Sequence, residues 1–148
     1  MSVPVSLLAS RLKVEVSDDG ATWTLLRGID GAAPHVVPVT ANRIIYTGGW
    51  GGSVVLSNNW TLTVTYKQRA TGSSRDAGQS KVESRVGQTL ADALIWVRWY
   101  DRNGIDDGQS GQATVAVSKA VTGPDGLDSV TVVFTGDGEL TAIDNPAA

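Results

Sequence analysis

The chain has 148 residues, a formal net charge of −3, one histidine and no cysteine. A chain of this length fits one domain that buries roughly 70% of its unfolded surface, so its core needs no metal or disulfide. The lack of cysteine excludes thiolate zinc sites, iron–sulfur clusters and a cysteine nucleophile, and the acidic charge argues against tight binding to a phosphate backbone.

Hydropathy and composition further narrow the class of protein. No apolar run approaches the roughly 20 residues of a membrane helix, and residues 3–9 are too short for a signal peptide, so we expect a soluble, unprocessed protein. Val, Thr and Ile make up about a quarter of the chain, and glycine about 11%. Branched residues favour pleated sheets and glycine favours turns, so the composition predicts a mainly β protein.

The first third of the chain predicts a hairpin and then a long irregular segment. Alternating apolar residues at 12–16, turn residues at 17–20 and renewed alternation at 22–27 are typical of a hairpin. Residues 28–52 contain two prolines and four glycines around Trp50, with only a weak strand signal at 43–46. We interpret this segment as a long loop, which compact domains usually keep for a functional reason.

A second hairpin is expected next. It would open at 53–56 and turn at Asn58-Asn59, because asparagine accepts left-handed turn geometry. The residues that follow alternate strictly between apolar and polar, which predicts a half-buried strand. The core face of this strand consists of Trp60, Leu62, Val64 and Tyr66.

Helical periodicity replaces the strand pattern after residue 69. Asp76 is a suitable N-cap, Gln79 stands at the capping-box position, and Val82, Val86 and Leu90 repeat every four residues. The pattern predicts one amphipathic helix over about residues 77–91, weakened by two internal glycines.

The rest of the chain returns to strands. Residues 94–100 are apolar on both faces except for Arg98, which indicates a strand covered on both sides. The remaining elements are a polar loop at 101–111, strands at about 112–121 and 128–135, and an irregular tail from 136 to 148. The sequence therefore predicts a β-sandwich or barrel with one flanking α-helix, long loops and extended terminal arms.

Signals for catalysis are weak. His35 has no Gly-x-Ser-x-Gly elbow to complete a Ser-His-Asp site. The adjacent acids at 18–19 and 106–107 are typical of turns, and the loop at 101–112 does not follow the calcium-binding pattern. We expect no enzymatic activity, no metal and no cofactor. A hydrolase that uses the loop carboxylates is kept only as the last alternative.

The five tryptophans could form a stacking platform for sugars or bases. Trp23, Trp60 and either Trp96 or Trp99 follow strand patterns and are expected in the core. Trp50 differs, because its glycine neighbours give it little local cover. An exposed tryptophan there suggests contact with another chain.

Several short motifs stand in a fixed order along nearly the whole chain. They are Lys13–Val16 with Trp23 and Arg27–Ile29, Gly49-Trp50 ahead of Trp60–Leu62, Asp76–Gln79, Val97–Arg102, Leu127–Val132, Thr135–Gly138 and Asp144–Pro146. Together they resemble the tail tube (major tail) proteins of long-tailed bacteriophages, particularly phages of actinobacteria and related Gram-positive hosts. The chain departs from the family in lacking acids at 42–47 and in having Ala77 and Ser80 at the helix entry.

The resemblance implies a structural protein of the virion tail, made in the host cytoplasm, that self-assembles into stacked hexameric rings. The tube would enclose the tape measure protein, meet tail-terminator and distal tail proteins at its ends, and conduct phage DNA without specific binding and without a membrane. It implies one domain over 1–148, with an N-terminal arm at 1–11, a β-sandwich at 12–135 and a C-terminal arm at 136–148.

Two sets of residues are expected to serve this function. The residues expected to contact other subunits are Trp50, Tyr46, Arg43, Trp99 and Arg98. Charge is uneven, because residues 1–75 carry +3 and residues 76–148 carry −6. The excess acid is either a solvated face or, as we expect for Asp106 and Asp107, a lumen-facing surface that repels DNA.

One alternative from another class stays open. A monomeric β-sandwich could bind a carbohydrate, or mediate adhesion, through Trp50 and a neighbouring aromatic residue. It predicts a monomer whose tryptophan fluorescence changes when sugar is added.

Overall fold

The computed structural model describes residues 12–44, 51–68, 70–71, 74–120 and 129–146. The strands are β1 (Leu12–Ser17), β2 (Thr24–Leu25), β3 (Ile29–Ile44), β4 (Gly51–Lys67), β5 (Ala70–Thr71), β6 (Ser74–Arg75), β7 (Ile95–Asp101), β8 (Gln109–Ala120), β9 (Ser129–Gly136) and β10 (Thr141–Ala142). The helical elements are the α-helix α1 (Ala77–Glu83) and the 3₁₀-helix η2 (Leu90–Ala93).

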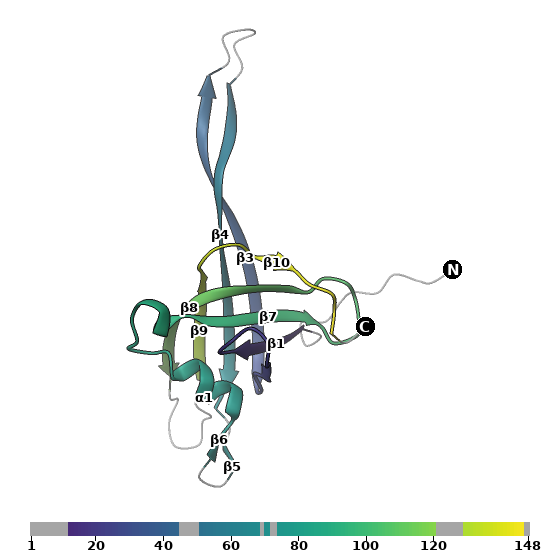
Figure 1. The fold of residues 1–148 in the computed structure, drawn as a ribbon, viewed down its shortest axis with the longest axis vertical. Coiled ribbons are helices and arrows are strands. Elements are labelled where there is room, and N and C mark those ends of the chain that lie inside the picture. The colour runs from purple at the N-terminus through teal and green to yellow at the C-terminus, as the bar shows by residue number, and fades with distance from the viewer. Residues whose placement is uncertain (1–11, 45–50, 69, 72–73, 121–128, 147–148) are drawn as a thin grey trace, which may run out of the picture.

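One antiparallel sheet contains most of the strands. Its order is β2-β1-β7-β8-β9-β4-β3, and β10 pairs with the start of β8, while β5 and β6 form a separate small hairpin. In Figure 1, β1, β7 and β8 cross in front of β9, β4 and β3, so the sheet folds into two layers. The fold joins the layers through β8, because its residues 109–113 pair with β7 and its residues 113–120 pair with β9. This confirms the predicted β-rich architecture with one α-helix.

The core lies between the two layers. Every second residue of each central strand points inward, as the two-residue period of a strand requires. The buried apolar side chains on these strands include Val14 and Val16 of β1; Trp60, Leu62, Val64 and Tyr66 of β4; Ile95, Val97 and Trp99 of β7; and Val130, Val132 and Phe134 of β9. The predicted core face of residues 60–66 is confirmed. Burying each large side chain stabilises the fold by about 1.5–3 kcal/mol.

The prediction of a long loop at 28–52 is wrong for the described residues of that segment. Residues 29–44 form a continuous strand, β3, which pairs with β4 along its whole length. Pro34 and Pro38 fit because β3 is the edge strand of the sheet, where a missing N–H removes no ladder bond on the open side. The turn expected at Asn58-Asn59 is also wrong, since both residues continue β4 opposite β3.

The predicted helix exists, but it is shorter than expected. Asp76 is its N-cap and accepts a hydrogen bond from the backbone N–H of Gln79 at 3.3 Å. The helix ends at Glu83, whereas Val86 and Leu90 are 53% and 90% exposed. The periodicity beyond residue 83 therefore does not reflect a buried face, and Gly87, at φ +83°, lies in the turn that follows the helix.

Ion pairs hold α1 on the body. Glu83 pairs with Arg75 of β6 and lies 3.1 Å from the ammonium of Lys119 on β8. On the other side, Asp18 after β1 pairs with Lys81 at 2.9 Å, and the hydrogen bond and charge of Lys81 lower the pKa of the Asp18 carboxyl. No helix among the described residues is long and apolar enough to span a membrane.

The buried amide of Gln79 joins α1 to two other segments. Its Nε2 donates to the backbone carbonyls of Arg27 and Lys67, both at 2.8 Å. The side chain is 2% exposed. It bridges the chain after β2 to the end of β4, and so it closes the gap between the two layers beneath α1.

Replacing Gln79 by leucine should destabilise the subunit by about 2–4 kcal/mol, because two partly buried backbone carbonyl groups would lose their donor and each unsatisfied group costs about 1–3 kcal/mol. Urea denaturation of dilute protein measures the loss. Gln88→Leu is the matched control, since Gln88 is exposed and its change should stay within about 0.5 kcal/mol. Equal effects of the two substitutions would contradict the assigned role of Gln79.

Candidate assembly surfaces

A long hairpin arm projects from the body. The pairing of β4 with β9 stops at Thr61, and beyond this residue β4 pairs only with β3. We call this hairpin, residues 37–44 and 51–59, the arm. Figure 1 shows it extending well away from the two-layered body. A two-stranded ribbon without a third strand is marginally stable in water, so the arm is a candidate for contact with another molecule.

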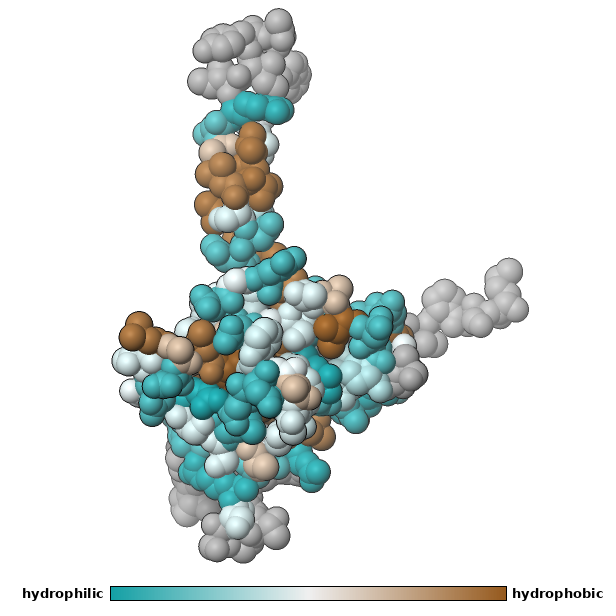
Figure 2. Space-filling view, viewed as in Figure 1, coloured by the Kyte–Doolittle hydropathy of each residue, from teal (hydrophilic) through white to brown (hydrophobic). Residues whose placement is uncertain are grey.

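The middle of the arm is apolar, which is unusual for an exposed hairpin. Figure 2 shows a hydrophobic band there, with hydrophilic residues on either side. The band consists of Val37, Val39, Val54, Val55 and Leu56, which are between 41% and 66% exposed. Val54 and Val55 are adjacent in β4 and so point to opposite faces of the ribbon. The band therefore surrounds the arm, and exposed clusters of this kind mark contact sites.

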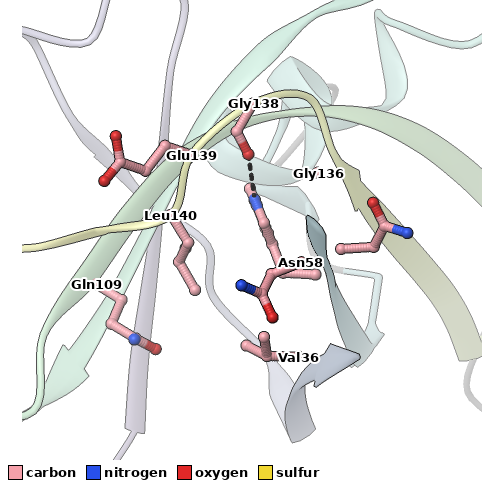
Figure 3. Close-up of a pocket in the computed structure, with 9 residues that line it drawn as sticks. Val36, Asn58, Gln109, Gly136, Gly138, Glu139 and Leu140 are labelled. Carbon is pink, nitrogen blue, oxygen red and sulfur yellow. Dashed lines mark hydrogen bonds between the residues drawn. The ribbon is translucent and has the colours of Figure 1, made fainter. Parts of the chain in front are cut away.

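A cleft of about 740 Å³ lies at the base of the arm, between β3–β4 and the segment that follows β9. Figure 3 shows Val36, Asn58, Gln109 and Leu140 around it, and the bond from Trp60 Nε1 to the Gly138 carbonyl, which is 3.1 Å long. The segment after β9 thus crosses over the first residues of the arm.

Trp60 fixes the base of the arm through a tight slot. An added Cβ would lie 2.5 Å from its ring at Gly111 and 2.3 Å from it at Gly136. The ring of Trp99 lies 5.8 Å away, centre to centre. Only glycine leaves room at these two positions, so the slot sets the direction in which β4 leaves the body.

The four-stranded unit β8-β9-β4-β3 has an open edge on each side within the part of the chain that the structure describes. β3 ends the sheet and pairs only with β4. β8 pairs with β7 only as far as Ala113, so residues 114–120 have β9 on one side and no described strand on the other. The two open edges bound a four-stranded unit, β8-β9-β4-β3. Open edges carry unpaired N–H and C=O groups, which favour pairing with another chain.

Of the expected contact residues in the long segment, the structure places Arg43 on the arm, exposed and opposite Gly52. Tyr46 and Trp50 lie outside the described residues. The assigned contact therefore stays a prediction for all three. The apolar valines and Leu56 were missed, although Val54, Val55 and Leu56 stand consecutively in the sequence.

The other two expected contact residues are engaged within the subunit. Trp99 is 2% exposed and forms part of the core. The guanidinium of Arg98 donates to Glu15 at 2.6 Å and lies 4.5 Å from the centre of the Trp23 ring. Burial, together with a hydrogen bond to Glu15, raises the pKa of Tyr100 to about 12. The outer face of this strand is thus covered partly by the subunit's own side chains.

Asp106 and Asp107 lie in the loop between β7 and β8, and both are exposed. Asp107 accepts a hydrogen bond from the Asp101 backbone N–H at 3.2 Å. Asn145 of the C-terminal segment donates to the carbonyls of Asp101 and Ile105 at 2.8 and 2.6 Å. The loop is therefore well ordered by its own contacts, and its lumen-facing position stays a prediction.

The described residues form no recognisable catalytic site and no recognisable sugar-binding site. Among them, no cluster of three His, Asp or Glu side chains is arranged to hold a metal ion. Trp60 and Trp99 are buried, Trp23 lies under Arg98, and Trp96 packs on the turn at Gly20. No flat stack of exposed tryptophans is formed by these four residues, and Trp50 lies outside the described part.

Comparisons with known proteins identify the fold. No protein-family model matches the sequence, and no curated protein matches it. Among solved structures, the tail of an empty gene transfer agent particle with C6 symmetry matches with a TM-score of 0.66 at 12% identity, covering 93% of this chain and 99% of that one. The virion of the native gene transfer agent particle matches with a TM-score of 0.65 at 11% identity, covering 92% and 98%.

A third match is the SPP1 tail tube, with a TM-score of 0.67 at 18% identity, covering 96% of this chain and 82% of that one. At these identities the likeness establishes the fold, and the expected host group stays a prediction. The chain thus has the fold of phage-type tail and tail tube proteins over nearly its whole length.

Proposed function

We propose that this chain is the structural subunit of a phage-type tail tube and assembles with itself into hexameric rings that stack. The observation that carries the proposal is the pair of open edges on one four-stranded unit, at β3 and at residues 114–120 of β8. A unit with complementary open edges joins head to tail, and such heterologous contacts form a ring when the rotation closes. The shared fold and the C6 symmetry of the gene transfer agent tail support six copies.

Ring closure removes the exposed edges. In the proposed ring, β3 of one subunit pairs with residues 114–120 of β8 in the next subunit, and the sheet continues around the axis. A closed barrel leaves no edge for aggregation, which is the usual solution for antiparallel proteins. The same pairing covers part of the base of each arm.

The arms join successive rings. Each arm reaches beyond the body that forms its own ring, and its apolar band requires cover on both faces. If each arm lies between two subunits of the adjacent ring, both faces of its apolar band are buried. Arg43, Tyr46 and Trp50 would extend this contact.

The tube acts as a passive conduit within the virion tail. We propose that it surrounds a tape measure protein during assembly, meets terminator and distal tail proteins at its ends, and later lets DNA pass without specific binding. The subunit would be made in the cytoplasm of the host and would act as one domain, with terminal arms at 1–11 and 136–148. No catalytic role is proposed.

Electron microscopy of the purified protein tests the proposal. At high concentration, in sulfate salts that strengthen apolar association, the chain should form rings or tubes with a central channel. A reconstruction should place β3 of each subunit beside β8 of the next. A chain that stays monomeric under all these conditions and changes its tryptophan fluorescence with sugar would contradict the proposal in favour of the carbohydrate-binding module.

A further inference from the structure

One face of the four-stranded unit carries no charged side chain over three complete rows. Strand register places the twelve residues of this face side by side. The rows are Gly31, Thr65, Thr131 and Ser118; then Ala33, Thr63, Val133 and Ala116; then His35, Thr61, Thr135 and Thr114. None of the twelve is buried. We call this surface the threonine face.

The threonine face is chemically distinct from the rest of the body. Six of its twelve residues are threonine, and its ionisable side chain is that of His35. At the rim, the ammonium of Lys67 lies 3.6 Å from Asp30, so this pair adds no net charge. The chain as a whole has 27 charged side chains, from 12 Lys+Arg and 15 Asp+Glu, so an uncharged surface of this extent is a specific feature of these strands.

The geometry of a closed ring decides which face lies inside. The opposite face of β4 and β9 carries the core and is covered by the second layer, with β1, β7 and α1. When the sheet closes around an axis, the bulky second layer needs the larger circumference outside. The uncovered threonine face is then turned toward the channel. This step rests on the proposed function, because it needs the ring.

We propose that the threonine face lines the channel and that a nucleic-acid duplex passes over uncharged hydroxyl and methyl groups. Lysine or arginine at this surface would bind phosphates by releasing counterions, and acids would repel them. A neutral lining does neither, so passage depends little on the salt concentration. The lining thus replaces the acidic lumen that the charge of the second half suggests, and Asp106 and Asp107 lie in the loop before β8 rather than on this face.

A single cysteine can locate the threonine face, because the natural chain has none. Thr63→Cys places a thiol in the middle of the face, and Thr89→Cys is the matched control, on an exposed threonine between α1 and η2. Tubes of each variant are treated with a small maleimide and with a maleimide coupled to a protein too large to enter the channel.

The expected result is that both cysteines react with the small reagent, whereas the bulky reagent labels Thr89→Cys at least tenfold more than Thr63→Cys in intact tubes. Dissociated subunits should show no such difference. Equal labelling of both positions by the bulky reagent in intact tubes would overturn the assignment. Microscopy detects separately whether tubes form. A failure to form tubes would count against the proposed function and not against the assignment of the threonine face.

The neutrality of the lining is tested with a short fluorescent DNA duplex as the probe. Unmodified tubes should retain only a background amount of duplex in a nuclease-protected form at low salt. Thr63→Lys tubes should retain at least ten times more, and the retained amount should fall as salt rises. Retention of protected duplex by the unmodified tubes, at the level of the lysine variant, would overturn the proposal.

Discussion

Replacing Leu56 by aspartate should abolish tube assembly while leaving the subunit folded. Leu56 is 66% exposed in the isolated chain and lies at the β-bulge of the arm, in the middle of the apolar band. In the proposed tube its side chain is buried against another subunit, where a carboxylate would lose both its hydration and the apolar contact. A loss of about 2–3 kcal/mol per subunit raises the concentration needed for assembly about 30-fold or more.

Leu90→Asp is the matched control for this experiment. Leu90 is also an exposed leucine, at 90%, but it lies at the start of η2, away from the arm. Sedimentation and electron microscopy measure assembly, and circular dichroism verifies that both variants keep the fold. If Leu56→Asp assembles like the unmodified chain, or if Leu90→Asp blocks assembly equally, the apolar band has no special role in stacking.

The paired strands β3 and β4 also show how far the sequence alone predicts this fold. Strict alternation at residues 60–66 predicts β4 and its buried face correctly, because one face of that stretch packs in the core between the layers and the other face does not. The same reasoning misreads residues 29–44, where Pro34 and Pro38 are usually signs of a loop. They are tolerated because β3 forms ladder bonds on only one side, and this is a property of the sheet order rather than of the local sequence.

The helix illustrates the opposite error. Its start is predicted correctly from Asp76 and Gln79, since capping is a local interaction. Its end is not, because a period of four at Val86 and Leu90 looks like a buried face until the fold leaves both exposed. Gly78, which local propensity marks as a weak point, is required by packing, because an added Cβ would lie 2.4 Å from the Leu25 carbonyl oxygen.

The candidate contact surfaces could be predicted only in part, because they too depend on how distant segments pack together. The strand apolar on both faces predicts contact with another subunit at Arg98 and Trp99; within the subunit Trp99 lies in the core and Arg98 pairs with Glu15, and the contact stays a prediction. The threonine face depends on the register between two strand pairs, β3–β4 and β8–β9, that are far apart in sequence. No single segment reveals it, because each strand contributes only three of the twelve residues of this face.

Replacing Gly136 by alanine should destabilise the subunit by about 3 kcal/mol, near the upper end of the cost of overpacking a core. The new Cβ would lie 2.3 Å from Nε1 and Cε2 of Trp60, a distance that real contacts do not reach. The indole ring would have to move. It would then lose its hydrogen bond to the Gly138 carbonyl and its contact with Trp99. Urea denaturation of dilute protein, followed by tryptophan fluorescence, measures the change.

Gly31→Ala serves as the matched control, because nothing lies within 4 Å of the Cβ that it adds, and its stability should change by no more than about 0.5 kcal/mol. Trp60→Phe removes the hydrogen bond and also the part of the indole that fills the slot, so its cost is about 0.5–1.5 kcal/mol for the bond plus the cost of the cavity that the smaller ring leaves. Because Trp60 fixes the direction of the arm, Gly136→Ala should also assemble less well at temperatures where it remains folded. A folded Gly136→Ala chain with unchanged stability would show that the slot tolerates a side chain and that the arm is positioned by other contacts.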